Sequence, residues 1–219
     1  MFNELNQWLA SRCGKFTASE IHKLMGKGRS GDYFGLVAKT YISTKAAEVL
    51  TLEPANQRGP TMAMEWGHAH EFEAITKFKE LYGEIEYFGG ENPTFFPYGE
   101  YAGGSPDGLG KDFVVEVKCP FNSSEHLQHS LLQTDEDLKD YAPEYYWQCV
   151  ANMLFANKEQ AFFISYDPRF DIQYQLKVLK FKCNLDDRSL LVERIMEAEK
   201  ELKKLLINFE AATKDAEQI

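Results

Sequence analysis

The sequence predicts a mixed α/β domain in which helices pack on a central sheet. Its first part reads as helices, its centre as short β-prone runs separated by Gly and Pro, and its last part as helices and strands in turn. The chain has 219 residues and is 44% hydrophobic, which is enough for one sizeable core. No internal repeat or low-complexity segment divides it. We therefore expect a single domain over residues 1–219.

The N-terminal part, about residues 1–82, is expected to be helical. Apolar residues recur there with helical spacing, and glycines follow the expected helix ends. Thr17 and Glu20 have the spacing of a capping box at the start of one short helix. The expected helices are Phe2–Leu9, the stretch TASEIHKLMG, Tyr33–Leu50 and Thr61–Tyr82, with Gly83 closing the last.

The central part, about residues 85–180, is expected to form the sheet. Its short β-prone runs, punctuated by Gly and Pro, are typical of an antiparallel meander. A charged helix at about residues 186–213 follows. The expected strands are Ile85–Phe88, Thr94–Phe96, Tyr101–Gly104, Phe113–Lys118, Gln160–Tyr166 and Gln173–Lys180, and the helices among them are Ser123–Leu132 and Pro143–Asn157.

Charge is distributed unevenly along the chain. The net charge of −10 argues against a protein that coats nucleic acid nonspecifically, because phosphate binding needs concentrated positive charge. Residues 1–60, however, contain eight Lys and Arg against five Asp and Glu, so they carry +3 and the rest −13. From Arg12 to Arg29 the sequence contains five basic residues and a single acidic one, Glu20. An anionic ligand could bind there, although an ordinary solvated basic face would give the same pattern.

The cysteines and the apolar segments indicate the compartment. The four cysteines are far apart and form no CxxC pair, so neither a disulfide framework nor a zinc site is indicated. An iron–sulfur cluster usually draws several ligands from closely spaced cysteines, and this pattern does not favour one. No stretch approaches the ~18 apolar residues of a membrane span, and MFNELNQWLASRC does not resemble a signal peptide. We expect reduced thiols and a cytosolic protein.

The stretch SPDGLGKDFVVEVKCP carries the clearest chemical signal. Side chains alternate along a strand, so Glu116 and Lys118 share one face while the intervening Val117 takes the other. If the glycines form a hairpin turn, Asp107 ends the preceding strand and reaches the same space. Two converging carboxylates form a site suited to Mg²⁺ or Mn²⁺, and a nearby lysine can orient water or stabilise negative charge. The alternative is an ion pair on an edge strand beside an ordinary turn.

Pro106-Asp107 followed by Glu116-Val117-Lys118 has the form of the PD-(D/E)XK nuclease signature. Six blocks surround it in a fixed order: WLASRCGKFTASEIH, GKGRSG, WGHAHEFEA, SPDGL, EVKCPF and YDPR. In these blocks the chain resembles the phage lambda exonuclease and YqaJ-like viral recombinase family, over about residues 8–169. The resemblance implies a PD-(D/E)XK, restriction-endonuclease-like core and a Mg²⁺-dependent 5′-to-3′ exonuclease that digests one strand of linear duplex DNA.

The resemblance also implies roles for the residues of the motif. Asp107, Glu116, the backbone carbonyl of Val117 and Glu71 of the WGHAHE block would hold two Mg²⁺ ions, with Mn²⁺ as a possible substitute. Lys118 would activate the attacking water.

A glutamine on a later helix belongs to the same implied site. Gln148 would hold the nucleophilic water or the scissile phosphate, unless backbone groups merely satisfy it. Relatives with a Q-x-Q pattern have a second glutamine where this chain has Val150. His68 and His70 flank Glu71, and a helix-surface role is favoured for them over metal binding.

Further residues are implied to contact DNA. Arg12, Ser19 and Ser105 would form a pocket for the 5′-terminal phosphate, since arginine offers bidentate contacts and serine adds a hydroxyl. Arg29 of GKGRSG would enter the minor groove of the downstream duplex. Met64 would act as an apolar wedge at the end base pair, although methionine on a helix is usually a core residue.

The family context implies partners as well. Relatives form a ring-shaped homotrimer and work beside a single-strand annealing protein in phage or prophage recombination, in the cytoplasm of a bacterial host. The acidic C-terminal helix, Asp186–Glu217, is one candidate docking surface, and a solvated exterior helix is the alternative. Two other functions remain open: another PD-(D/E)XK enzyme, such as a RecB-like nuclease or a restriction-type endonuclease, and a non-catalytic end-binding module.

Overall fold

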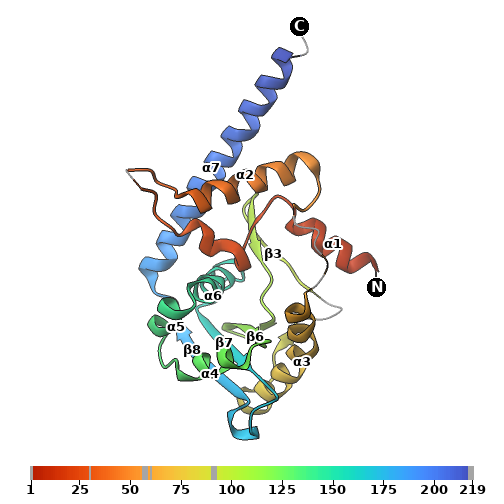
Figure 1. Cartoon of the computed structure of the whole chain (residues 1–219), viewed down its shortest axis with the longest axis vertical. Coiled ribbons are helices and arrows are strands. Elements are labelled where there is room, and N and C mark those ends of the chain that lie inside the picture. The colour runs from red at the N-terminus through yellow and green to blue at the C-terminus, as the bar shows by residue number, and fades with distance from the viewer. Residues whose placement is uncertain (1, 30, 56–58, 60, 90–92, 217–219) are drawn as a thin grey trace.

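A five-stranded sheet forms the centre of the molecule, with helices around it (Figure 1). The computed structural model describes residues 2–29, 31–55, 59, 61–89 and 93–216. The strands are β1 (Phe16–Thr17), β2 (Glu86–Tyr87), β3 (Phe96–Tyr98), β4 (Ala102–Gly104), β5 (Gly108–Leu109), β6 (Phe113–Lys118), β7 (Gln160–Tyr166) and β8 (Leu176–Lys182). The helices are α1 (Phe2–Arg12), α2 (Leu36–Thr51), α3 (Met62–Tyr82), α4 (Ser123–Leu131), α5 (Asp135–Tyr141), α6 (Pro143–Phe155) and α7 (Leu185–Ala216), with 3₁₀ helices η1 (Ala18–Leu24) and η2 (Ile172–Tyr174).

The strands form two sheets. The larger has the order β2-β5-β6-β7-β8, and the smaller has the order β1-β4-β3. In the larger sheet β6 and β7 run parallel, while the other neighbours run antiparallel. A parallel pair needs a long connection, and α4, α5 and α6 provide it between β6 and β7. The predicted mixed α/β fold, with a central mixed sheet flanked by helices, is confirmed.

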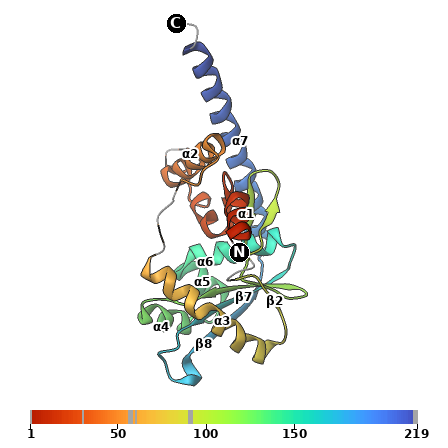
Figure 2. The same ribbon diagram turned by 90° about the vertical axis from the view of Figure 1, so that its right-hand side faces the viewer.

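Helix α3 covers one face of the larger sheet and helix α6 covers the other (Figure 2). Strand β7 shows this alternation, because Phe162 and Ile164 pack in the cluster with α3. Ala161 and Phe163 pack in the cluster with α6. Strands buried on both faces carry continuous apolar runs, as β7 does in QAFFISY. The α6 cluster also takes in side chains from η1, α2 and α7, so the two ends of the chain share one core.

Helix α7 has a buried part and an exposed part. The part up to Leu202 buries Leu191, Ile195, Ala198 and Leu202, which lie on one face at helical spacing. From Ile207 to Lys214 every residue is exposed, and this end of the helix extends away from the body (Figure 1). The helix begins at Leu185, close to the expected Asp186, and reaches Ala216. Glu217, the last residue of the candidate docking surface, lies outside the described residues.

The expected central meander is wrong. After β2 the chain leaves the larger sheet, forms β3 and β4 in the smaller one, and returns as β5. Strand β4 pairs in parallel with β1, which is 86 residues away in register, from Phe16 to Ala102. Pairing over that distance leaves no local pattern in the sequence, which is why neither β1 nor the division into two sheets was expected.

The helix predictions differ from the structure at two places. The TASEIHKLMG stretch is the 3₁₀ helix η1, and its expected capping box does not form, because Thr17 makes no side-chain capping bond. Thr17 instead lies in β1, and its N–H donates to the hydroxyl of Tyr41. Helix α5 was not expected, although Thr134 and Asp137 form a capping box there. Thr61–Tyr82 is confirmed as α3, with Thr61 as its cap and Gly83 at its end.

Candidate active site

A pocket of about 540 Å³ opens at the C-terminal end of β6. Residues of α1, η1, α3, β2, β6 and α6 line it, together with the segment 105–107 before β5, so parts of the chain that are distant in sequence meet there. The residues implied for the metal site and the phosphate pocket that line it are Arg12, Ser19, Glu71, Ser105, Asp107, Glu116, Val117, Lys118 and Gln148.

The pocket lies where the sheet ladder stops. Strand β5 has only two residues, Gly108 and Leu109, which pair with Val115 and Val114 of β6. Beyond them the side chain of Asp107 takes over, because its Oδ2 accepts from the N–H of Val117 at 2.7 Å. A strand residue's N–H and C=O lie on the same side, so the Val117 carbonyl is also on the side of Asp107. Asp107 therefore precedes β5, rather than ending an earlier strand as expected.

Glu116 is almost fully buried, with 1% of its surface exposed. Its Oε1 accepts from Lys118 Nζ at 2.7 Å, and its Oε2 accepts from Asn152 Nδ2 at 2.9 Å. Lys118 Nζ also donates to Gln148 Oε1 at 3.3 Å and lies 4.9 Å from the ring of Tyr145. The ion pair considered as an alternative therefore exists, but on an inner strand between β5 and β7 and not on an edge. Gln148 meets a side chain and not only backbone groups.

The three carboxylates around the pocket repel one another. Burial and the charge of Glu71 raise the pKa of Asp107 to about 7. Burial and the charge of Asp107 raise the pKa of Glu116 to about 8. Burial also raises the pKa of Glu71. For Lys118 burial acts downward, but Glu116 and Asp107 outweigh it and raise its pKa. One ammonium thus faces three carboxylates, and the site favours additional positive charge.

Glu71 reaches the pocket from helix α3. Its Oε1 accepts from the hydroxyl of Tyr87 at 3.0 Å, and Tyr87 itself lines the pocket. His68 is exposed and lines the pocket too. His70 lies elsewhere, with its ring 4.1 Å from that of Trp66 and its Nδ1 3.8 Å from Glu73.

The carboxylates are engaged with protein groups in this conformation. Asp107 binds the backbone of Val117, Glu116 binds Lys118, and Glu71 binds Tyr87. Within the described part of the chain, no three His, Cys, Asp or Glu side chains are grouped as ligands around one point. An ionised carboxylate offers about four acceptor positions on its two oxygens, so each of these groups keeps capacity for a further partner.

The implied phosphate-binding residues converge at one side of the pocket. Arg12 Nη1 is 3.5 Å from Ser105 Oγ, and Arg12 Nη2 is 3.4 Å from Ser19 Oγ. Trp8 adds two contacts, because its Nε1 donates to Ser105 Oγ at 2.9 Å and its ring lies 4.4 Å from the guanidinium carbon of Arg12. The long arginine contacts leave donors directed at hydroxyls that an anion could replace.

The two residues implied to contact duplex DNA lie apart. Met64 lines the main pocket with 51% of its surface exposed, so it is not a core residue. Arg29 is exposed and lines a separate hollow of about 620 Å³ together with Lys23 and Lys27. The basic residues Lys23, Lys27 and Arg29 therefore line a hollow of their own and do not line the pocket of the carboxylates.

With this geometry in view, the comparison with family models is decisive. The YqaJ-like viral recombinase domain matches residues 7–159. The chain belongs to this family. The resemblance drawn from the short blocks is confirmed.

Solved structures of two exonucleases share the fold of this YqaJ-like protein. An alkaline exonuclease from Laribacter hongkongensis has 23% identity and a TM-score of 0.78, over 96% of this chain and 99% of that one. The same enzyme has been solved in complex with dAMP. A phage-related exonuclease from Haemophilus somnus 129PT has 16% identity and a TM-score of 0.71, over 89% of this chain and 96% of the other. No curated protein matches the chain.

Some residues in the pocket of the YqaJ-like protein, or directly behind it, were not predicted from the sequence. Asn152 holds Glu116, and a signal for it existed, since it follows Gln148 by four positions and so shares its helix face. Trp8 precedes Arg12 by four positions in the same way. Tyr87 and Tyr145 left no comparable pattern, because their approach to the pocket depends on how β2 and α6 pack.

The YDPR block acts outside the pocket. Arg169 binds both oxygens of Asp167, at 2.8 and 2.7 Å, and also the carbonyl of Pro120 at 3.2 Å. Its guanidinium carbon lies 4.5 Å from the ring of Trp66 on α3. The block thus joins the chain after β6 to the helix that carries Glu71.

Two further expectations concern the whole chain. In the described residues, no helix is long and apolar enough to cross a membrane. The four cysteines are free thiols; Cys119 and Cys149 are buried, and Cys13 and Cys183 are half-buried.

Proposed function

We propose that this YqaJ-like protein is a metal-dependent exonuclease that digests the 5′-ended strand of linear duplex DNA and leaves a 3′ single-stranded overhang. One observation carries the proposal. The carboxylate–lysine group of Asp107, Glu116 and Lys118 shares a single pocket with the anion-binding group of Arg12 and Ser105. Membership of the family and the fold shared with two exonucleases support it.

The donor set fits two Mg²⁺ ions, with Mn²⁺ as a substitute. Asp107, Glu116, Glu71 and the carbonyl of Val117 would hold them, since hard cations prefer carboxylate and carbonyl oxygen. The excess of carboxylates over ammonium groups in the pocket, and the raised pKa of Asp107 and Glu116, support this assignment. Such ions lower the pKa of a coordinated water and neutralise charge on phosphate oxygens.

Lys118 and Gln148 would handle the attacking water. Nζ of Lys118 donates to Glu116 and Gln148, and these bonds fix its position in the pocket. From there it would contact a water or a phosphate oxygen. As a donor beside the scissile phosphate it would stabilise the negative charge that develops during hydrolysis. Asn152 would keep the Glu116 carboxylate in one orientation.

The phosphate pocket would give the enzyme its requirement for an end. Arg12, Ser19 and Ser105 would bind the 5′-terminal phosphate, with Trp8 steadying both Arg12 and Ser105. Ser105 is two residues before Asp107, so the terminal and the scissile phosphate would be held by one short segment. The complex of the Laribacter enzyme with dAMP supports recognition of a mononucleotide, the product that an exonuclease releases.

The surrounding surface would guide the duplex. Met64, exposed at the pocket, would act as the wedge at the last base pair, and Arg29 with its basic neighbours would follow the downstream duplex. We further propose a homotrimeric ring around DNA and a single-strand annealing protein that receives the product strand. The enzyme would act in phage or prophage recombination, in the cytoplasm of a bacterial host.

The proposal is tested with a linear duplex labelled at either end of one strand, with and without a 5′ phosphate and Mg²⁺. We expect early release of the 5′ label as mononucleotide, faster digestion of phosphorylated ends, and no digestion without the metal. A covalently closed circular duplex should remain intact. Robust cleavage of the circle would instead indicate a restriction-type or RecB-like endonuclease, and binding without digestion would indicate an end-binding module.

A further inference from the structure

The connection between Arg12 and Ser19 determines how far apart these two phosphate-binding residues lie. Arg12 ends helix α1, and Ser19 lies near the start of η1. Between them the chain has little regular structure, since β1 contains two residues. The distance of 3.4 Å from Arg12 Nη2 to Ser19 Oγ therefore depends on what holds this connection in place.

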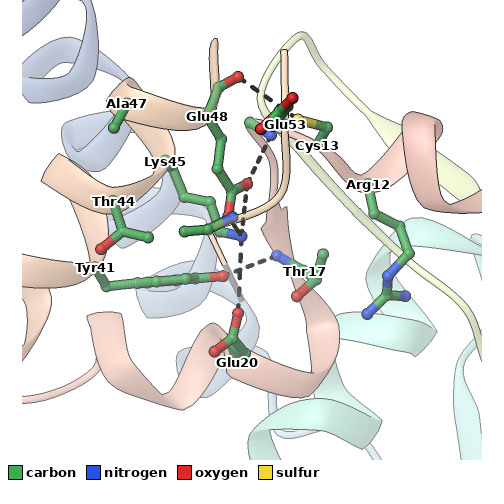
Figure 3. A network of polar contacts seen from close by, with 12 residues as sticks. Arg12, Cys13, Thr17, Glu20, Tyr41, Thr44, Lys45, Ala47, Glu48 and Glu53 are labelled. Atoms are coloured by element: carbon green, nitrogen blue, oxygen red, sulfur yellow. Dashed lines mark hydrogen bonds and ion pairs between the residues drawn. The ribbon is translucent and has the colours of Figure 1, made fainter. Parts of the chain in front are cut away.

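Helix α2 holds the connection at three points (Figure 3). A carboxylate oxygen of Glu48 accepts from the N–H of Gly14 at 2.9 Å, and the carbonyl of Glu48 accepts from Cys13 Sγ at 3.5 Å. The hydroxyl of Tyr41 accepts from the N–H of Thr17 at 3.0 Å. None of these α2 side chains lines the pocket. They therefore act on the phosphate-binding residues only through the connection that they hold.

Gly14 makes this close approach possible. Its φ is +70°, a left-handed conformation that side chains disfavour, and a Cβ there would lie 2.6 Å from Val49 of α2. The backbone of the connection therefore rests directly on the helix, and its N–H reaches the Glu48 carboxylate.

Glu48 is itself fixed by a buried cation. Only 5% of Glu48 and 6% of Lys45 is exposed. Lys45 Nζ lies 3.1 and 3.0 Å from the two oxygens of Glu48, and the N–H of Ala55 donates to the same carboxylate at 3.1 Å. With donors from three directions the carboxylate has one favoured orientation. Buried pairs of this kind add little net stability, so their effect on geometry is the larger consequence.

Lys45 also acts on the charge next to the pocket. Its Nζ lies 3.8 Å from an oxygen of Glu20, the residue that follows Ser19, and Lys23 pairs with the same carboxylate. A free carboxylate at this position would repel a phosphate, so the two lysines keep the Arg12 side of the pocket attractive to anions.

We propose that Glu48, held by Lys45, is a positioning residue that sets the spacing of Arg12 and Ser19 and thereby the preference for 5′-phosphorylated ends. This inference rests on the proposed function, because it deepens the phosphate pocket assigned there. Neither residue touches the DNA. They act through the backbone of the connection.

The test compares kcat/KM on linear duplexes that differ only in a 5′ phosphate or a 5′ hydroxyl. Glu48→Gln keeps the shape of the side chain but replaces one acceptor oxygen with a donor and removes the charge that Lys45 needs. We expect the ratio of phosphorylated to hydroxyl ends to fall about tenfold, mainly through a higher KM for phosphorylated ends. A purely structural role would lower the active fraction and reduce both values equally. An unchanged ratio would therefore overturn the inference.

Two further variants secure the comparison. Glu53→Gln removes the charge of an exposed carboxylate just after helix α2. It should leave the ratio of phosphorylated to hydroxyl ends unchanged. If Glu48→Gln folds poorly, the double variant Lys45→Met, Glu48→Met removes both buried charges, a replacement that proteins often accept without loss of stability. This double variant should unfold at a temperature close to that of the wild type and still lose the preference. A retained preference in a folded double variant would contradict the proposal.

Measurements on the wild type distinguish the proposed phosphate pocket from the role of Glu48. If the wild type does not digest linear duplex, or digests 5′-phosphorylated and 5′-hydroxyl ends equally, both the phosphate pocket and this inference are overturned. A wild type that prefers phosphorylated ends, with Glu48→Gln preferring them just as strongly, overturns only the role of Glu48.

Discussion

Asn152 donates from Nδ2 to Oε2 of Glu116 at 2.9 Å, and both side chains are buried. The amide occupies the carboxylate oxygen that Lys118 leaves free. A helix face of α6 therefore supports the strand that carries the proposed metal ligand, and the support can be measured apart from catalysis.

Replacing Asn152 with Leu should destabilise the protein by about 2 kcal/mol, the order expected when a buried polar group is left without its hydrogen-bond partner. Urea unfolding in the presence of EDTA measures this. In a Glu116→Ala background the same replacement should cost much less, because the carboxylate that Asn152 serves is gone. If Asn152→Leu lowers the free energy of unfolding equally in both backgrounds, Asn152 supports the fold by contacts other than that with Glu116.

Lys118→Ala should lower the rate of digestion of linear duplex by at least about 10²-fold, because a donor beside the scissile phosphate is lost. Single-turnover digestion with excess enzyme measures the chemical step. Lys204→Ala, at an exposed position of α7, is the matched control. Wild-type digestion by Lys118→Ala would remove the lysine from the mechanism.

Arg12→Ala should reduce the preference for 5′-phosphorylated over 5′-hydroxyl ends by about 10- to 100-fold, as expected for charge-assisted hydrogen bonds to a phosphate. Lys15→Ala serves as the control, because Lys15 Nζ binds the carbonyl of Glu100, away from the pocket. The preference should survive there. If Arg12→Ala keeps it as well, the phosphate is bound elsewhere.

Tyr87→Phe should weaken Mn²⁺ binding by about tenfold, since partners that orient metal-binding carboxylates contribute to affinity on this scale. The ring can keep its contact with Phe72, with centroids 5.9 Å apart, while the hydrogen bond to Glu71 is lost. Titration calorimetry on the DNA-free protein measures the affinity without relying on activity. Tyr82→Phe, outside the pocket, should bind Mn²⁺ as the wild type does.

His129 should make the protein less stable as the pH falls from about 6.5 towards 4. Burial, with charge from His126 and Lys118, lowers the pKa of His129 to about 4, so the unfolded chain takes up its proton first. Stability is therefore full above about pH 6.5 and decreases below it, with a slope of up to ~1.4 kcal/mol per pH unit. Urea unfolding of wild type and His129→Phe should give a stability difference that is constant above pH 7.5 and changes below pH 6.5. A constant difference throughout would contradict the assignment.

The bounds of helices and strands that are determined by neighbouring residues were predicted well from the sequence. Strand β7 has the expected bounds, and α3 begins one residue after the expected Thr61 and ends at the expected Tyr82, before Gly83. The two-residue strands β1 and β5 escaped, because so short a pairing is decided by a partner strand and not by its own residues. The hairpin turn moved for the same reason: Gly110 and not Gly108 begins it, with the N–H of Gly110 donating to Phe113.

The site divides in the same way. Asp107, Glu116 and Lys118 were brought together by strand alternation and the spacing across one turn, and the structure brings them together in one pocket. Arg12 and Ser105 are 93 residues apart, and no physical argument from sequence could join them. Their grouping came from the family resemblance. Tyr87 was missed by both routes, because its contact with Glu71 depends on where a two-residue strand places it.

Val117 gives its side chain to the α3 cluster and its backbone to the proposed active site. Polar function and side-chain identity are therefore separated at this position. Evolution or a designer could exchange valine for another residue of similar volume and alter only the packing. Proline would be the exception, because it removes the N–H that Asp107 binds. A saturation library at position 117 should accordingly rank its variants by volume and β-propensity, with proline excluded for a reason unrelated to either.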